Sequence, residues 1–506
     1  MWREESKEGT GVWFVRFALL FYMESRDRNM YDVAIIGCGV IGAATAFELS
    51  KYKLHTLILE KENDVAMGAS RANSAIIHAG YDPKPGTLMA RLNVEGNKMA
   101  ETLCKDLSVP FNRVGSLVLA FSDEEMLTVW ELFDRGEKNG VPGIKVLMAD
   151  EVKKMEPMVS DQVVGALYAP SAGIISPWDY AMAFAEVAVT NGVELKLSTR
   201  VEGIEKTENG YKISTNNGAY EAKYIINAAG VESDLIHEMV AEKTFTVLPN
   251  RGEYYLMDKC EVVRADHVLF QCPNKDGKGV LVAPTVGGNL IVGPNAVGVA
   301  DRDRVNNTAD GLNFVREHAL KTVPSINFRN SIRNFTGIRA NTDHDEFMIG
   351  IAAENFVDLA GIKSPGLSSA PAIALEALRL LKMCGLNPEK NEKAITTRKK
   401  LRFRTLSEDA RREAVKKNPL YGRVICRCET VTEGEIVDAI HSPIPPCSVD
   451  GVKRRAGTGM GRCQGGFCGP RVLDILAREL KVSPMDILQD GAGSNILLNE
   501  TKVEVK

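Results

Sequence analysis

The stretch DVAIIGCGVIGAATAFELSKYKLHTLILEK, residues 32–61, most constrains the fold, because it reads as strand, glycine turn, helix and second strand. Gly37, Gly39 and Gly42 give the GxGxxG spacing, which permits a tight turn, close approach of a pyrophosphate and close packing of helix on strand. Glu60 ends the second strand, where an acid accepts ribose hydroxyls and argues against a 2′-phosphate. The stretch predicts a Rossmann-like dinucleotide site, and the glycines alone do not distinguish FAD from NAD.

Composition excludes several classes of protein. With 506 residues, 44% of them hydrophobic and 25% charged, the chain is long enough for two or three domains with buried cores. A formal net charge of -4 gives no reason to expect nucleic acid or an acidic membrane as the main partner. Ten cysteines in so long a chain do not make a disulfide scaffold, which is typical of a reducing compartment. We expect a cytoplasmic protein, with peripheral attachment to the inner face of a membrane, through partners only, as the alternative.

Residues 1–29 precede the first strand and carry an apolar run at 12–23, which Arg16 interrupts. The run is too short to span a bilayer, and no small-residue cleavage site follows it. We expect residues 1–29 to be an unstructured extension without a structural role. A short amphipathic membrane anchor is the alternative.

Two later segments distinguish FAD from NAD. YIINAAGVES, residues 224–233, is a strand that runs into small residues, and NFVDLAGIKSPGLSSAPAIALEALRLL, residues 355–381, is a strand, a glycine-marked turn and a long helix. Both resemble FAD-contact segments of the D-amino-acid-oxidase-like (DAO) superfamily. The resemblance implies FAD as the cofactor and a helix whose positive N-terminal end faces the flavin. It implies cofactor contacts at Ala229, Gly230, Gly361, Gly366 and Leu367.

A third segment is expected to lie over the flavin. GASRANSAIIHAGYDPKPGTLMARLNVEGNKM, residues 68–99, resembles that stretch of L-2-hydroxyglutarate oxidases and, more distantly, of glycerol-3-phosphate dehydrogenases in the same superfamily. The resemblance places Ser70 and Ser74 against the cofactor. His78 is the candidate base that takes a hydroxyl proton while hydride leaves carbon, since the ordinary pKa of histidine lies near working pH. A structural histidine is the alternative.

Such a site also needs a clamp for an anionic substrate. NFTGIRANTD, residues 334–343, resembles the glycine-x-arginine stretch of the superfamily, so Arg339 is expected to grip a carboxylate or phosphate through two parallel hydrogen bonds. Family members commonly carry proline after this arginine, where this chain has Ala340, and the pose of the arginine stays open. The stretch LPNRGEYYLMD adds candidate substrate contacts at Arg251, Tyr254 and Tyr255. Strand packing or a surface ion pair explains these three equally well.

The resemblance covers residues 31–382 and implies an α/β fold in which a Rossmann-like FAD-binding domain is interleaved with an α+β substrate domain. The expected FAD-binding pieces are 30–80, 160–250 and 335–385, and the substrate-domain pieces are 81–159 and 251–334. Residues 386–423 are rich in Lys and Arg, which predicts a linker with a solvated surface face; docking to an acidic partner is the alternative. A small helical domain at 424–490 and a tail at 491–506 are expected to follow.

Four clustered cysteines mark the C-terminal domain. VICRCET and RCQGGFC carry two close pairs, separated by thirty-four residues: Cys426 with Cys428, and Cys463 with Cys468. The spacing resembles the bacterioferritin-associated-ferredoxin-like (BFD-like) [2Fe–2S] module, whose four thiolates hold the cluster. A structural zinc ion is the rival interpretation, although zinc ligands usually come as CxxC pairs.

Together these features predict an FAD-dependent dehydrogenase of a small anionic secondary alcohol, either glycerol 3-phosphate or an L-2-hydroxy acid such as 2-hydroxyglutarate. The layout also resembles the large subunit of anaerobic glycerol-3-phosphate dehydrogenases. That resemblance implies an electron-acceptor protein or partner subunits, which receive electrons singly from the cluster and lead to a quinone. The alternatives are an amine or amino-acid dehydrogenase subunit of the proline, sarcosine or opine type, and a non-catalytic electron-transfer subunit.

Overall fold

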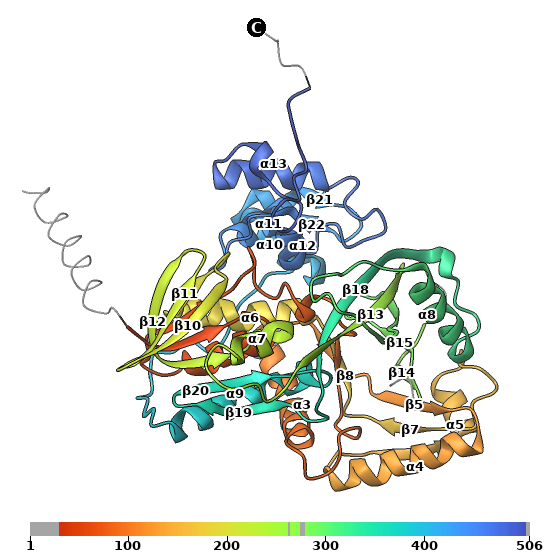
Figure 1. Cartoon of the computed structure of the whole chain (residues 1–506). Helices are drawn as coiled ribbons and strands as arrows, with labels where there is room; N and C mark the ends of the chain where they lie inside the picture. The colour runs from red at the N-terminus through yellow and green to blue at the C-terminus, as the bar shows by residue number, and fades with distance from the viewer. Residues whose placement is uncertain (1–29, 262–263, 274–278, 502–506) are drawn as a thin grey trace, which may run out of the picture.

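The computed structural model describes residues 30–261, 264–273 and 279–501 (Figure 1). The extension expected at residues 1–29 and the end of the expected tail, residues 502–506, lie outside the described residues.

The first sheet is built around parallel strands in the order β9, β2, β1, β12 and β20. Apolar runs such as YDVAII in β1 and TLIL in β2 suit strands that are buried on both faces. These parallel strands are β1 (Tyr31–Ile36), β2 (Thr56–Leu59), β9 (Glu194–Lys196), β12 (Gly218–Asn227) and β20 (Phe356–Ala360). Antiparallel strands extend the sheet: β10 (Val201–Thr207), β11 (Gly210–Thr215) and β19 (Met348–Ala353).

Helices α2 (Val40–Leu49), α6 (Pro177–Thr190) and α9 (Gly366–Met383) pack against this sheet and share its hydrophobic core. The helix α3 (Leu88–Asp106) packs against α9. Alanine-rich faces on α2, α6 and α9 let the helices approach closely. The glycine turn between β1 and α2 therefore has a rigid support.

The second sheet is largely antiparallel and runs in the order β17, β13, β16, β15, β14, β5, β7 and β6, with β18 paired to β13. Its strands are β5 (Ser116–Ala120), β6 (Lys145–Met148), β7 (Gly165–Ala169), β13 (Val247–Met257), β14 (Val268–Gln271), β15 (Leu281–Pro284), β16 (Leu290–Gly293), β17 (Val297–Gly298) and β18 (Ser331–Thr342). Helices α5 (Ala149–Met155) and α8 (Ala309–Thr322) pack on one face of this sheet. The helix α4 (Asp123–Lys138) packs on the opposite face, which also carries Tyr254. The interleaved α/β architecture predicted from the sequence is confirmed.

Two strands cross the boundaries expected between the domain pieces. β7 falls within 160–250 yet pairs with β5 of the second sheet, and β18 begins before residue 335 and pairs along its length with β13. Antiparallel pairing between segments distant in sequence decides to which sheet each strand belongs. The composition of the sequence does not reveal this pairing. A small sheet of β3 (Ile76–Ile77), β4 (Phe111–Asn112) and β8 (Gly173–Ile175) lies between the two large sheets.

The basic linker is largely exposed, as its composition predicted, but three of its cations pack against the flavin-binding part of the chain. Arg398 and Lys400 reach the buried carboxylate of Asp179 at 2.8 and 2.9 Å, and Arg402 binds the same group. Burial would raise the pKa of Asp179, but the three cations outweigh it and hold that pKa well below its usual range. Residues 398–402 are thus anchored to α6, and the helix α10 (Glu408–Lys417) follows.

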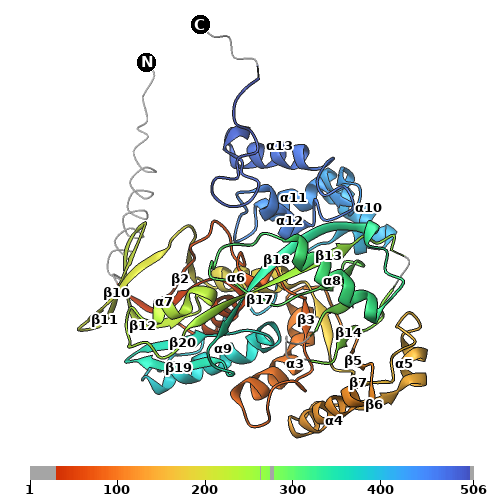
Figure 2. The same cartoon turned by 45° about the vertical axis from the view of Figure 1, so that its right-hand side comes forward.

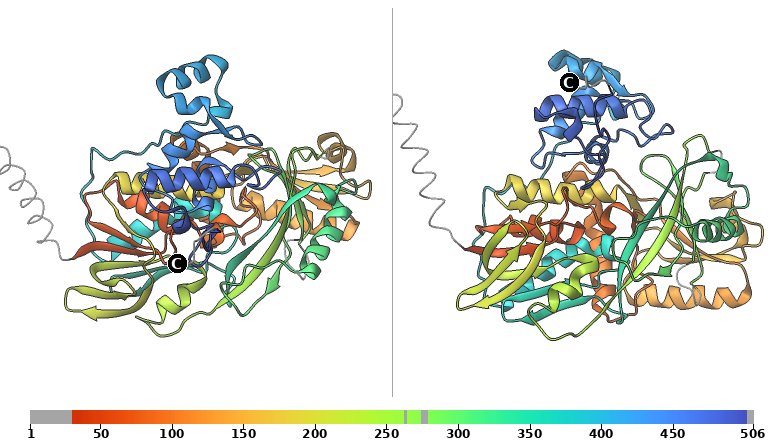
Figure 3. Two further views of the ribbon diagram at one scale, coloured as in Figure 1. Left: turned by 90° about the horizontal axis from the view of Figure 1, so that it is seen from above. Right: turned by 45° about the horizontal axis from the view of Figure 1, so that its top comes forward.

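The C-terminal domain contains β21 (Val424–Cys426), β22 (Val431–Thr432), α11 (Glu433–Ile440), α12 (Val449–Ala456) and α13 (Gly469–Leu480). Thr432 and Ser448 cap α11 and α12 through their hydroxyls, as their sequences predicted. Figures 2 and 3 show this domain above the region where the two large sheets meet. Its position brings the cysteine loops to the same side of the molecule as the glycine turn.

Candidate functional site

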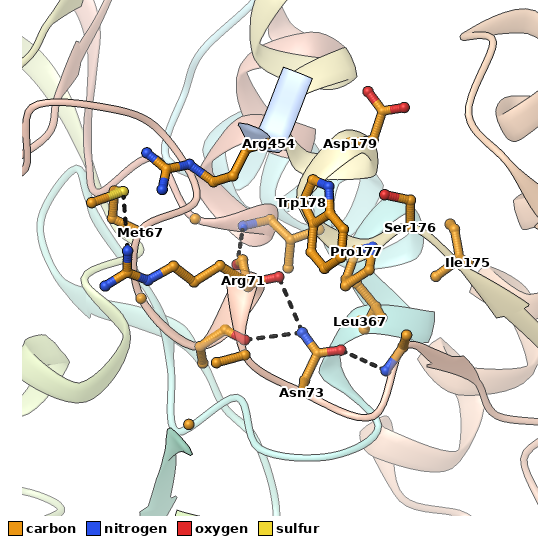
Figure 4. Close-up of a pocket in the computed structure, with 18 of the residues that line it drawn as sticks. Met67, Arg71, Asn73, Ile175, Ser176, Pro177, Trp178, Asp179, Leu367 and Arg454 are labelled. Carbon is orange, nitrogen blue, oxygen red and sulfur yellow. Dashed lines mark hydrogen bonds between the residues drawn. The ribbon is translucent and has the colours of Figure 1, made fainter. Parts of the chain in front are cut away.

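A cavity of about 1380 Å³ lies between the two sheets and reaches beneath the C-terminal domain. It opens at the carboxyl ends of β1, β2 and β12, the usual place for ligands in an open α/β sheet. Figure 4 shows part of its wall, where Arg71 and Arg454 lie on one side and Trp178 and Leu367 on another.

The glycine turn forms a cradle that larger residues would fill. Gly37 has φ +97°, and a Cβ there would stand 2.6 Å from the carbonyl oxygen of Ala228; a Cβ on Gly42 would stand 2.0 Å from the carbonyl oxygen of Gly37. Gly37 and Gly39 line the cavity, while Gly42 packs behind them. The amide of Val40, in the first turn of α2, donates to Ser70 Oγ at 2.9 Å. This turn suits a pyrophosphate at the N-terminus of a helix.

Glu60, at the end of β2, lines the cavity beside this cradle. Its carboxylate accepts hydrogen bonds from the amides of Cys38 at 2.7 Å and Glu62 at 3.0 Å. Burial raises the pKa of Glu60 to about 7, although the two amides oppose the shift. Ala229 and Gly230, from the second predicted segment, line the same part of the cavity. The two backbone amides therefore fix the orientation of the Glu60 carboxylate.

The N-terminus of α9 faces the other part of the cavity. Gly366 and Leu367 line it, and Gly361, with φ +60°, forms the turn that leads there without lining it. A positive helix end at this position favours negative charge on a bound ring.

His78 is held from both sides of the cavity wall. Its amide donates to Ser368 Oγ of α9 at 2.7 Å, and its carbonyl accepts from Asn93 and Asn97 of α3 at 2.9 and 3.0 Å. The imidazole Nε2 lies 3.3 Å from Ser364 Oγ, and the ring lines the cavity. These contacts fix the backbone of His78 at the cavity wall.

Arg339 and Tyr254 face the cavity from the second sheet. Arg339 donates to Asn250 Oδ1 at 2.7 Å and to the carbonyl of Asn295 at 3.3 Å, which orients its guanidinium. Tyr254 stacks on Phe335 with ring centroids 4.7 Å apart, and its hydroxyl lies 3.2 Å from Ser74 Oγ. The structure thus brings His78, Arg339, Tyr254, Ser70 and Ser74 to one cavity.

Arg251 and Tyr255 lie on the opposite face of β13. Side chains alternate along a strand, so residues of odd separation from Tyr254 point away from the cavity. Arg251 approaches the buried carboxylate of Glu253 at 3.8 Å, and Tyr255 packs edge-on against Phe328. The structure does not bring either residue to the cavity wall.

The four clustered cysteines form two pairs. The sulfur atoms of Cys428 and Cys463 lie 3.7 Å apart, and Cys468 donates to Cys426, which lowers the pKa of Cys426 to about 6. In the described part of the chain, no three His, Cys, Asp or Glu side chains converge to hold one metal ion. Two thiol pairs match a cluster with two irons better than a single zinc ion.

Backbone amides surround these thiols. The amides of Glu429 and Gly459 donate to Cys426, and those of Gly465 and Phe467 donate to Cys463. Donors of this kind stabilise thiolates and adjust the potential of a cluster. A Cβ on Gly461 would stand 2.3 Å from Cys428 Cβ, so the loops wrap closely around the pairs.

Comparison with known proteins supports both the nucleotide-binding cavity and the cysteine site. The model of FAD dependent oxidoreductases (DAO) matches residues 32–380, and that of BFD-like [2Fe-2S] binding domains matches residues 424–478. The chain belongs to the DAO family of FAD-dependent oxidoreductases. This oxidoreductase carries FAD and a [2Fe–2S] cluster, and the glycine cradle and the paired thiols fit these groups.

The oxidoreductase is 51% identical over 480 residues, 94% of its length and 100% of the relative, to a glycerol 3-phosphate dehydrogenase of Caloramator mitchellensis. An L-2-hydroxyglutarate dehydrogenase of Escherichia coli is 32% identical over 53% of this chain and 64% of its own length. The structure of L-alpha-glycerophosphate oxidase from Mycoplasma pneumoniae with FAD bound is similar, with a TM-score of 0.69 and 34% identity over 73% of this chain and 98% of that one.

Buried ion pairs join the two redox parts of this oxidoreductase. Asp64, in the loop after β2, binds Arg454 at 2.9 Å and Arg455 at 2.7 Å, and all three side chains are buried. Arg333, which lines the cavity, donates to Gln464 at 3.4 Å, and Gln464 is the neighbour of Cys463. The C-terminal domain is thus seated directly on the flavin domain. No helix in the described ranges has the length and apolar character to cross a bilayer.

Changing Asp64 to Asn should lower the free energy of unfolding by about 3–5 kcal/mol, because it leaves two buried guanidiniums without their shared carboxylate. Burial favours the neutral acid, but the two arginines hold the pKa of Asp64 below its usual value. Its stabilisation is therefore present above the pKa of the unfolded chain and is lost as pH falls through the folded pKa. Urea unfolding near neutral pH and at low pH measures both effects.

The exposed carboxylate of Asp161, which pairs with Lys153, supplies the control for this test. Asp161→Asn should leave the unfolding midpoint unchanged. An Asp64→Asn protein as stable as the parent at neutral pH would contradict the assigned role of the interdomain ion pairs.

Sequence reasoning missed several residues of the site. Ser364 contacts the imidazole of His78, Asn250 orients Arg339, and Asp179 gathers the linker cations. Ser364 stands in the quoted segment before Pro365, so its place in the motif was visible although its partner was not. The partners of Asn250 and Asp179 lie 89 and more than 200 residues away, beyond the reach of local pattern.

Proposed function

We propose that this chain is a glycerol 3-phosphate dehydrogenase that oxidises the secondary alcohol of its substrate to a ketone and passes the electrons to a separate acceptor. One observation carries the proposal. His78 and Arg339 lie in one cavity beside the N-terminus of α9, in a chain 51% identical over nearly its whole length to a protein of that name.

Each cavity residue has a part in this reaction. Arg339 binds the phosphate of the substrate through its guanidinium N–H groups, and Asn250 keeps that group oriented. His78 takes the proton of the hydroxyl as hydride leaves the same carbon. Ser364 lies against the imidazole and holds its orientation. The second sheet closes over the site and excludes water.

When bound, FAD would supply a two-electron hydride acceptor, and the [2Fe–2S] cluster would supply one-electron transfer. Cys426, Cys428, Cys463 and Cys468 would hold the cluster. It keeps this domain against the flavin domain through Asp64 and Arg454. The acceptor is a separate protein or a partner subunit.

An L-2-hydroxy acid such as 2-hydroxyglutarate is the second candidate substrate, because a relative of that activity covers half of this chain. A comparison of kcat/KM for glycerol 3-phosphate and L-2-hydroxyglutarate, with a dye as acceptor, tests the proposal. We expect a preference for glycerol 3-phosphate of at least about a hundredfold, since a site arranged for one anion leaves polar groups unpaired with another. A preference for the hydroxy acid would overturn it.

Changing Arg339 to Ala should raise KM for glycerol 3-phosphate about tenfold to a hundredfold with a smaller effect on kcat, because charged hydrogen bonds to the phosphate are lost. Steady-state kinetics with the dye acceptor measure the change. Arg339→Lys keeps the charge without the planar fork and should recover part of the loss. An unchanged KM in the Ala variant would exclude Arg339 as the clamp.

A further inference from the structure

One pair of the cluster thiols lies at the protein surface. Cys428 is exposed and Cys463 is half-buried, whereas Cys426 and Cys468 are buried. The cluster-bearing domain therefore presents one edge of its thiolate set to solvent. An electron leaving through this edge has the shortest path to another molecule.

An exposed aromatic residue stands beside this edge. Phe467 is 78% exposed, the largest exposed fraction among the large apolar side chains of the described residues. Its own amide donates to Cys463, so the ring projects from the loop that holds the exposed pair. Aromatic residues of this kind anchor protein–protein interfaces.

Three arginines lie close to the cluster cysteines in the sequence. The charged residues between 460 and 471 are Arg462 and Arg471, and between 424 and 428 the one charge is Arg427. Arg427 and Arg471 are exposed, and Arg462 is exposed while lying 3.5 Å from Asp258. The nearby Glu429 is buried and binds Lys259 and Arg404. This positive surface stands on a chain whose net charge is -4.

We propose that Phe467, Arg427, Arg462 and Arg471 form a docking surface for an acidic, one-electron acceptor protein. This inference rests on the proposed function, because it names the partner of the same electron exit. Phe467 fills a pocket of the acceptor, and the arginines attract its acidic face. Arginine is favoured at such surfaces, and complementary charge raises the rate of association.

The electron balance requires two docking events for each substrate. Oxidation of one alcohol to a ketone releases two electrons and two protons. Each oxidised acceptor molecule takes one electron and then leaves, so two acceptors are reduced per alcohol. The protons pass to solvent. A surface that is exposed and charged, and not a deep pocket, suits such repeated and transient binding.

Zinc-substituted rubredoxin, a small acidic protein without redox activity, serves as the binding probe for the holoprotein in calorimetry. We expect the dissociation constant to rise about tenfold or more between low and physiological salt. Phe467→Ala should raise it about tenfold or more at constant salt, and Arg471→Glu should do the same. Lys138→Glu on α4, at the far end of the molecule, makes the same charge change and should have no effect (Figure 1).

Two further readouts separate this inference from the proposed function. The visible spectrum of Phe467→Ala should match the parent, and anaerobic bleaching of its flavin by glycerol 3-phosphate should proceed at the parental rate. Reduction of iron rubredoxin by the same variant should slow about tenfold. If bleaching is normal while rubredoxin binding is absent, insensitive to salt or unchanged by Phe467→Ala, the docking surface is refuted. If bleaching fails while Phe467-dependent binding persists, the substrate is wrong and the docking surface stands.

Discussion

Changing His78 to Asn slows the anaerobic bleaching of the flavin by glycerol 3-phosphate about a hundredfold to ten-thousandfold, which is the usual contribution of a positioned general base. Asparagine cannot take the hydroxyl proton, while the backbone of residue 78 keeps its hydrogen bonds to Ser368, Asn93 and Asn97. Binding of FAD and of substrate should be retained. Stopped-flow absorbance at saturating substrate measures the rate.

His318 provides a matched control, because it lies on α8 outside the cavity wall, and its ring contacts Phe314 of its own helix. His318→Asn should bleach at the parental rate. A rate for His78→Asn within about threefold of the parent would show that His78 is not the base, since even a modest general base contributes far more. The histidine would then be structural.

Changing Cys428 to Ser should remove the cluster and uncouple the two halves of the reaction. The hydroxyl of serine is a much poorer ligand than a thiolate, and the pair with Cys463 is broken. Flavin bleaching by substrate should persist, while reduction of a one-electron acceptor protein should fall at least about a hundredfold, because electrons no longer reach the surface singly. Iron and sulfide analysis and acceptor kinetics measure the two effects.

Cys447 is the control for this substitution. It is an exposed cysteine of the same domain, outside the two pairs, and its thiol donates to the carbonyl of Asn63 at 3.6 Å. Cys447→Ser should keep full iron content and full acceptor reduction. Stoichiometric zinc in place of iron in the parent protein would contradict the cluster.

The sequence predicted those parts of the fold that depend on residues close together in the chain. The turn at Gly37 requires a positive φ and a close approach of Gly42. The glycine spacing in the sequence indicates both requirements. Thr432 and Ser448 were readable as caps because a cap bonds amides two or three residues away. The spacing of Cys426 to Cys428 and of Cys463 to Cys468 was equally local, whereas the structure pairs Cys428 with Cys463 across 35 positions.

Contacts between residues far apart in the sequence could not be predicted in this way. Arg398, Lys400 and Arg402 look like a solvated basic run until the fold brings Asp179 beneath them. The face on which Arg251 lies, by contrast, was open to prediction. Residues three apart in a strand point to opposite sides, so Arg251 and Tyr254 could not both face one cavity.

The central claim is that a flavin reduced by a small anionic alcohol is joined to an iron–sulfur cluster in one chain. Anaerobic titration of the holoprotein with glycerol 3-phosphate, followed by visible absorbance and electron paramagnetic resonance, tests it most directly. We predict loss of the flavin absorbance with substrate and a signal from the reduced cluster, both absent from a sample without substrate. A protein that contains FAD and iron but is reduced neither by glycerol 3-phosphate nor by L-2-hydroxyglutarate would contradict the account.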